Sequence, residues 1–169
     1  MKILLRLNFA ITSFLFVPII SFWNPKFFSL MGVQPYWPLF WLLPWSIIYG
    51  SLNGALTGFL LGLVLDSLTN DYQTQIPGLI ICGIWFGRFS DSKIFINKLK
   101  FGLFAALGTV ICGLIYFLQI IFSSAHYKSP ILFSFAGMTI FSQVFLTGLL
   151  APIFCSWLLF LFNLKRSRI

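Results

Sequence analysis

Long apolar runs separated by short polar segments are the feature that most constrains the fold of this chain. A helix of about 20 apolar residues spans the roughly 30 Å hydrocarbon core of a bilayer. Charged residues make up 8% of the chain, whereas a soluble domain holds about 25%, so a water-facing surface cannot cover these runs. The pattern predicts an all-α, polytopic membrane protein in contact with membrane lipids.

The apolar runs predict six transmembrane helices in a single transmembrane domain over residues 1–169. The first run ends in Ser21-Phe22-Trp23, a poor cleavage site, and is therefore interpreted as a retained span rather than a signal peptide. The apolar segment 131–136 either extends the last span or lies in the membrane interface. The expected spans are 3–23, 35–49, 51–68, 76–90, 101–122 and 137–162.

Segment 35–49 is the least regular span, because Pro44 interrupts it and its roughly 14 helical residues reach only about 21 Å. Either it crosses as an interrupted helix, with the backbone freed at Pro44 shielded by neighbouring helices, or it re-enters on the same side and another segment divides. The positions of the basic residues favour crossing, because without this span the chain would have five spans and its basic C-terminal tail would lie outside. All but two of the 11 Lys and Arg residues lie at the chain ends or around the loop after 76–90, the exceptions being Lys26 and Lys128. Because basic residues mark the cytoplasmic side, both termini are expected to be cytoplasmic.

Glycines recur at every fourth residue through the third run and would form one groove on a helix. In a bilayer such a groove lets two helix backbones approach closely, and van der Waals contact then supplies the association that the hydrophobic effect cannot. Weaker stripes of small residues occur at Gly83 and Gly87 and again from Gly102 to Gly113. The groove consists of Gly50, Gly54, Gly58 and Gly62, and Asp66 continues the same line.

The glycine groove has two possible occupants. Trp37, Trp41 and Trp45 lie four residues apart in the preceding span, so they share one helix face and could pack into the groove. Alternatively, the groove docks another membrane protein. Asp66 also has two interpretations: an ionisable group at membrane depth that contacts a partner or positions its helix, or a residue of the headgroup region.

Residues for catalysis or metal binding are scarce. The chain has one histidine, His126, and three acidic residues, with no spacing typical of the three or four ligands of a metal site. Cys82, Cys112 and Cys155 lie within apolar runs and are interpreted as packing residues. No Walker loop or dinucleotide-binding motif is present. We therefore expect no enzyme activity, metal or cofactor, and we interpret the net charge of +8 as topology-setting and lipid-contacting rather than as nucleic-acid binding.

A short aromatic-rich span that opens at Pro38 and contains Trp45 is followed by a glycine-rich helix ending in an aspartate. The motif residues of that helix and of the next span's start are Gly54, Gly58-Phe59, Gly62-Leu63-Val64-Leu65-Asp66 and Pro77-Gly78-Leu79. From Pro35 to Leu79 this pattern resembles MreD, the rod shape-determining membrane protein family of bacteria. Chain length, six spans and cytoplasmic termini also fit that family.

The resemblance implies a non-enzymatic scaffold of the cell-wall elongation machinery in the bacterial plasma membrane. Its expected partners are MreC-like and MreB-like proteins and the peptidoglycan polymerase complex, and its expected role is maintenance of rod cell shape. The alternative is a substrate-binding membrane subunit of an energy-coupling-factor vitamin transporter, a class that the MreD family resembles in fold. A vitamin retained on purification would distinguish that alternative from a scaffold.

Overall fold

The computed structural model of the chain describes Ile19, Ser29 and residues 32–69, 73–89, 98–123 and 130–167. The elements in this part of the chain are α-helices, in agreement with the predicted all-α class. The expected span 3–23 lies outside the described residues except for Ile19, which is helical. The helices are α2 (Trp37–Tyr49), α3 (Ser51–Leu68), α4 (Ile76–Gly87), α5 (Lys98–Ser123) and α6 (Pro130–Ser167).

The helix bounds agree with expectation best in the third span and least in the last. Helix α3 covers 51–68 as predicted, whereas α4 ends at Gly87 because the chain turns at Arg88. Helix α6 begins at Pro130, so segment 131–136 extends the helix, which was one of its two expected placements. The 38 residues of α6 correspond to a helix of about 57 Å.

Three helical stretches among the described residues are long and apolar enough to cross a bilayer. They are Ser51–Leu68, Lys100–Phe122 and Gly137–Phe160. Their outward side chains are largely apolar, as expected for lipid contact; Leu52, Leu103 and Phe141 are each at least 66% exposed. Helix α4 is apolar but has only 12 residues, and α2 has 13. These features are those of a membrane protein.

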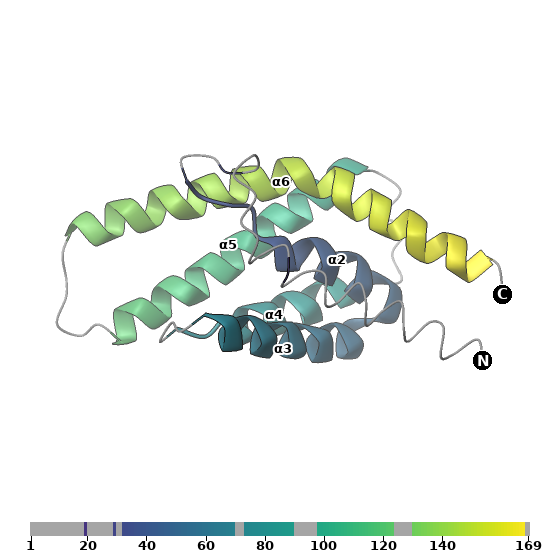
Figure 1. Cartoon of the computed structure of the whole chain (residues 1–169), viewed down its shortest axis with the longest axis horizontal. Helices are drawn as coiled ribbons and strands as arrows, with labels where there is room; N and C mark the ends of the chain where they lie inside the picture. The colour runs from purple at the N-terminus through teal and green to yellow at the C-terminus, as the bar shows by residue number, and fades with distance from the viewer. Residues whose placement is uncertain are drawn as a thin grey trace.

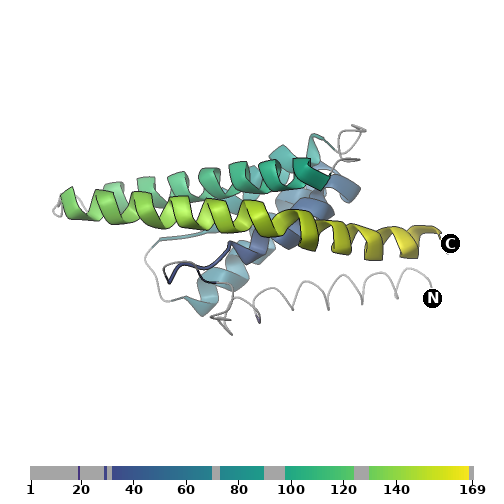
Figure 2. The same cartoon turned by 90° about the horizontal axis from the view of Figure 1, so that it is seen from above.

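Helix α2 lies at the centre of the described helices. It contacts α3, α4, α5 and α6, and Figure 1 shows it between the α3–α4 pair and the α5–α6 pair. Its residues Leu39, Leu42 and Leu43 are fully buried. A helix that is apolar on every side lies either inside a fold or in a membrane, and here neighbouring helices surround it. Figure 2 shows α5 and α6 running along one another over the rest of the fold.

Pro44 does not break α2, and a neighbouring helix supplies a weak hydrogen bond in place of the lost one. Proline has no N–H, so the carbonyl of Phe40, four residues earlier, loses its helical donor. The thiol of Cys155 on α6 donates to that carbonyl across 3.6 Å, and the Phe40 and Phe154 rings stack with centroids 5.4 Å apart. The expected shielding of freed backbone is therefore observed at Pro44, and the helix continues to Tyr49.

Candidate functional site

Helices α3 and α4 meet backbone to backbone along a line of glycines. A Cβ at Gly54 would collide with the carbonyl oxygen of Gly83, and one at Gly58 with the carbonyl oxygen of Leu79. A Cβ at Gly62 would lie 2.7 Å from Cα of Ile76. Close approach of this kind suits lipid, where packing and weak Cα–H···O contacts replace hydrophobic association.

The same contact requires glycine on α4 as well. A Cβ on Gly83 would collide with the carbonyl oxygen of Gly54, and a Cβ on Gly87 with the backbone of Ser51. We call this interface the glycine seam, comprising Gly54, Gly58, Gly62, Gly83 and Gly87. Within this fold the seam is an internal contact between two helices joined by a short connection.

Gly50 belongs to the predicted groove but not to the seam. A Cβ at Gly50 would have no heavy atom within 4 Å, so no packing contact requires glycine there. Its φ of +85° lies in the region that side chains other than glycine avoid. Its N–H donates to the carbonyl of Ser46 across 2.9 Å. Gly50 therefore forms the turn between α2 and α3.

The three tryptophans of α2 are not the nearest neighbours of the groove, contrary to the interpretation that they fill it. The closest atoms come from α4, with Ser46 of α2 beside Gly54. Trp37 instead packs edge-on against Phe154 of α6, with centroids 5.8 Å apart. Trp41 and Trp45 stack on each other at 4.9 Å. The tryptophans thus consolidate the central helix, while α4 covers the groove.

Asp66 connects the end of α3 to the start of α4. Its two carboxylate oxygens accept hydrogen bonds from the backbone N–H of Gln75, at 2.9 and 3.2 Å. Gln75 is the N-cap residue of α4, and a negative charge near a helix N-terminus is favourable. The half-buried Asp66 therefore takes the helix-positioning role, one of its expected alternatives.

Hydrogen bonds continue from Gln75 to two more helices. The hydroxyl of Tyr36, just before α2, donates to the side-chain carbonyl of Gln75 across 3.0 Å. The backbone N–H of Tyr36 donates to the Thr147 hydroxyl on α6, also at 3.0 Å. We call Asp66, Gln75, Tyr36 and Thr147 the polar link, because they connect α3, α4, the segment before α2 and the middle of α6 in one chain of hydrogen bonds.

Sequence reasoning identified Asp66 but missed the other three members of the polar link. Tyr36 and Thr147 are 111 residues apart, a separation that helix periodicity cannot bridge. One signal was available: amide side chains within apolar runs, such as Gln119 and Gln143, need polar partners. Gln119 does bond Thr74 reciprocally, accepting from its N–H at 2.8 Å and donating to its carbonyl at 3.0 Å.

A second close helix contact joins α5 to α6 through the small-residue stripe of α5. A Cβ at Gly102 would lie 2.7 Å from the carbonyl oxygen of Gly148. Pro152 cannot donate to that carbonyl, which stands four residues earlier in α6. Gly102 thus leaves room for a backbone group that the proline has freed.

The cysteines lie in packing positions. The sulfur atoms of Cys82 and Cys112 are 3.5 Å apart between α4 and α5, and both side chains are buried. Cys155 of α6 is also buried, against Phe40 of α2. In the part of the chain that the structure describes, no group of three His, Cys, Asp or Glu side chains could hold a metal ion.

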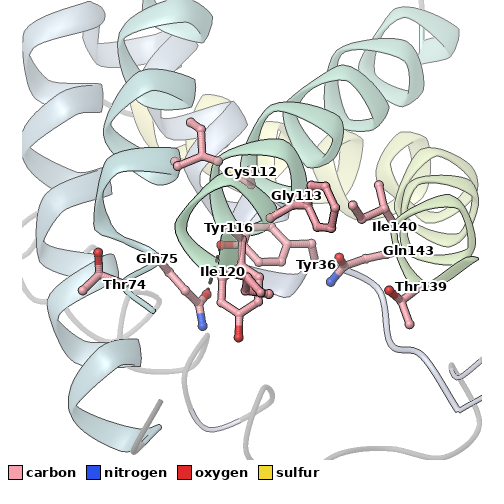
Figure 3. A pocket seen from close by; sticks show the side chains of 13 residues that line it. Tyr36, Thr74, Gln75, Cys112, Gly113, Tyr116, Ile120, Thr139, Ile140 and Gln143 are labelled. Atoms are coloured by element: carbon pink, nitrogen blue, oxygen red, sulfur yellow. Dashed lines mark hydrogen bonds between the residues drawn. The ribbon is translucent and has the colours of Figure 1, made fainter. Parts of the chain in front are cut away.

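A pocket of about 420 Å³ adjoins the polar link. It lies between the start of α4, the second half of α5 and α6, with Tyr36 as one wall. Figure 3 shows Gln75 and Gln143 on either side of Tyr36, with Tyr116 and Ile120 of α5 nearby. Its lining combines amide and hydroxyl groups with apolar walls.

No family model, curated protein or solved structure matches this chain. The part of the chain that the structure describes is all-helical, and its long apolar helices and glycine-mediated packing are those of a membrane protein.

Proposed function

We propose that this protein is a non-enzymatic membrane scaffold of the MreD type, acting in the bacterial cell-wall elongation machinery. The observation that carries the proposal is that the residues of the MreD-like pattern form one structural unit. Gly54, Gly58 and Gly62 face α4, and Asp66 holds the start of α4 in place. Contacts among these residues give the MreD-like pattern a structural basis that scattered residues would lack.

The second half of the pattern joins the same unit. Pro77 occupies the first turn of α4, where a proline N–H is not needed. Gly78 packs against Cys112 of α5, since a Cβ there would lie 3.3 Å from Cα of Cys112. Leu79 is fully buried and presents its carbonyl to Gly58. The glycines of the motif, Leu79 and Asp66 thus hold α3 and α4 together as a helical hairpin, which suits a protein that works by docking.

The proposal includes six spans with both termini in the cytoplasm of the bacterial plasma membrane. Three long apolar helices support a multi-pass chain. Helices α2 and α4 are each shorter than the roughly 30 Å hydrocarbon core, but α3, α5 and α6 surround α2. Arg88 at the end of α4 and Lys100 near the start of α5 place basic residues beside one connection, as expected for a cytoplasmic loop.

Under this proposal the chain works beside MreC-like and MreB-like proteins and a peptidoglycan polymerase complex, and it has no catalytic residues of its own. Depletion in the rod-shaped bacterium that carries the gene is expected to round the cells and to spread new wall synthesis away from its side-wall pattern. Microscopy with a fluorescent cell-wall precursor measures both effects. A copy carrying Phe141→Leu on the exposed face of α6 should restore rod shape. Unchanged shape and labelling after depletion would refute the proposal.

A further inference from the structure

The pocket beside the polar link has the dimensions of a small-molecule site. Its volume of about 420 Å³ lies within the roughly 300–1,000 Å³ of typical ligand pockets. Three helices and the segment before α2 contribute to its walls, so it is a feature of the tertiary fold. The Tyr36–Gln75 hydrogen bond of 3.0 Å joins two of the residues that line the pocket.

Two glutamine side chains that line the pocket have amide groups that are not fully hydrogen-bonded by the described residues. The Gln75 carbonyl accepts from Tyr36, which leaves the Gln75 amino group as a donor toward the pocket. Gln143 is half-buried and lines the pocket, and its backbone carbonyl, not its amide, accepts from Thr147. Within the described residues no hydrogen bond engages the Gln143 amide. An amide that lines a pocket is the kind of polar group that orients a bound ligand there.

The charge and shape of the walls narrow the class of ligand. The lining residues that the structure describes include no Lys, Arg, His, Asp or Glu, so among them an ionised ligand would lose water without gaining a counter-ion. The Asp66 carboxylate, bonded to the Gln75 backbone, further disfavours an anion. The aromatic residues Tyr36, Tyr116 and Phe117 are among the lining residues, and a planar ring can pack against aromatic side chains.

We propose that this pocket binds a neutral molecule with a planar ring and an amide or hydroxyl group. The ring packs against the aromatic wall, and the polar group bonds the amides of Gln75 and Gln143. This inference is independent of the scaffold role, which the co-purifying proteins test; a vitamin as the bound molecule would instead favour the alternative function. It concerns residues that lie outside the glycine seam.

The test uses three probes of one shape and different charge: indole-3-acetamide, indole-3-acetate and tryptamine. Binding to the purified full chain in detergent is measured by saturation-transfer NMR titration. The neutral amide should bind about tenfold more tightly than either ion, a difference of about 1.4 kcal/mol. Equal binding of the three probes, or no binding of the amide, would overturn the proposal.

Three substitutions test whether the probes bind in this pocket. Gln143→Leu keeps the side-chain size but removes the amide, and should weaken indole-3-acetamide binding about tenfold. Ile120→Trp narrows the pocket without altering either amide, and should weaken all binding. Phe141→Leu, at a position on α6 that is 73% exposed, is the matched control and should bind like the original chain. Thermal unfolding verifies that each variant is folded. Undiminished amide binding by folded Gln143→Leu and Ile120→Trp would contradict the assignment.

Discussion

Gly58→Leu is expected to abolish recovery of the folded chain, because the added side chain has no space. Its Cβ would collide with the carbonyl oxygen of Leu79, which belongs to the backbone of α4. A backbone group cannot rotate away as a side chain can, so the two helices would have to separate. The cost should exceed the roughly 1–3 kcal/mol of ordinary overpacking. Size-exclusion chromatography and thermal unfolding in mild detergent measure the effect.

A matched control exists on α6. Gly137 is exposed and has open space around a built Cβ, so Gly137→Leu adds the same side chain without a collision. It should be recovered like the original chain. Gly58→Ala tests the mechanism further, since the Cβ alone already collides. Equal recovery and melting of Gly58→Leu and Gly137→Leu would show that the glycine seam is not a close contact.

Asp66→Leu is expected to loosen the attachment of the start of α4 to the end of α3. The substitution removes both acceptors for the Gln75 N–H and leaves that donor without its partner, which costs about 1–3 kcal/mol. Asp66→Asn retains one acceptor oxygen and should lose less. Hydrogen–deuterium exchange over residues 73–79 reports the change directly, because exchange of the Gln75 amide should accelerate in Asp66→Leu.

Ser67→Ala provides the control for that measurement. Ser67 is exposed, and its hydroxyl bonds only the carbonyl of Val64 on its own helix. Exchange at residues 73–79 should stay unchanged in Ser67→Ala. If Asp66→Leu left exchange at these residues at the original rate, Asp66 would not position α4, and its role would have to be sought in the headgroup region.

Helix positions could be predicted well where a glycine or polar residues mark the ends of an apolar run. The run 51–68 lies between Gly50 and a polar segment, and α3 has those bounds. Segment 35–49 was harder because Pro44 suggests a break. The donor that faces the carbonyl freed by Pro44 belongs to Cys155, a residue more than a hundred positions away. A local pattern could indicate the need for such a donor but not its identity.

The glycine spacing identified which residues share a helix face but not what covers that face. Periodicity describes one helix at a time, whereas the occupant depends on how helices pair. A short connection between α3 and α4 favours pairing of sequence neighbours, and Gly83 and Gly87 were visible as a second stripe. Combining these two features would have favoured α4 over Trp37, Trp41 and Trp45 as the occupant of the groove. The polar link depends on long-range contacts, such as that between Tyr36 and Thr147, and left no comparable signal.

Purification of the chain from its own bacterium in gentle detergent, followed by identification of bound proteins and small molecules, tests the scaffold proposal most directly. We predict recovery of an MreC-like protein and components of the peptidoglycan polymerase complex with the original chain and with Gly137→Leu. Gly58→Leu should lose them. Recovery of an ATP-hydrolysing transporter module with a bound vitamin, and of no wall-synthesis protein, would contradict the proposal and favour a vitamin-binding subunit.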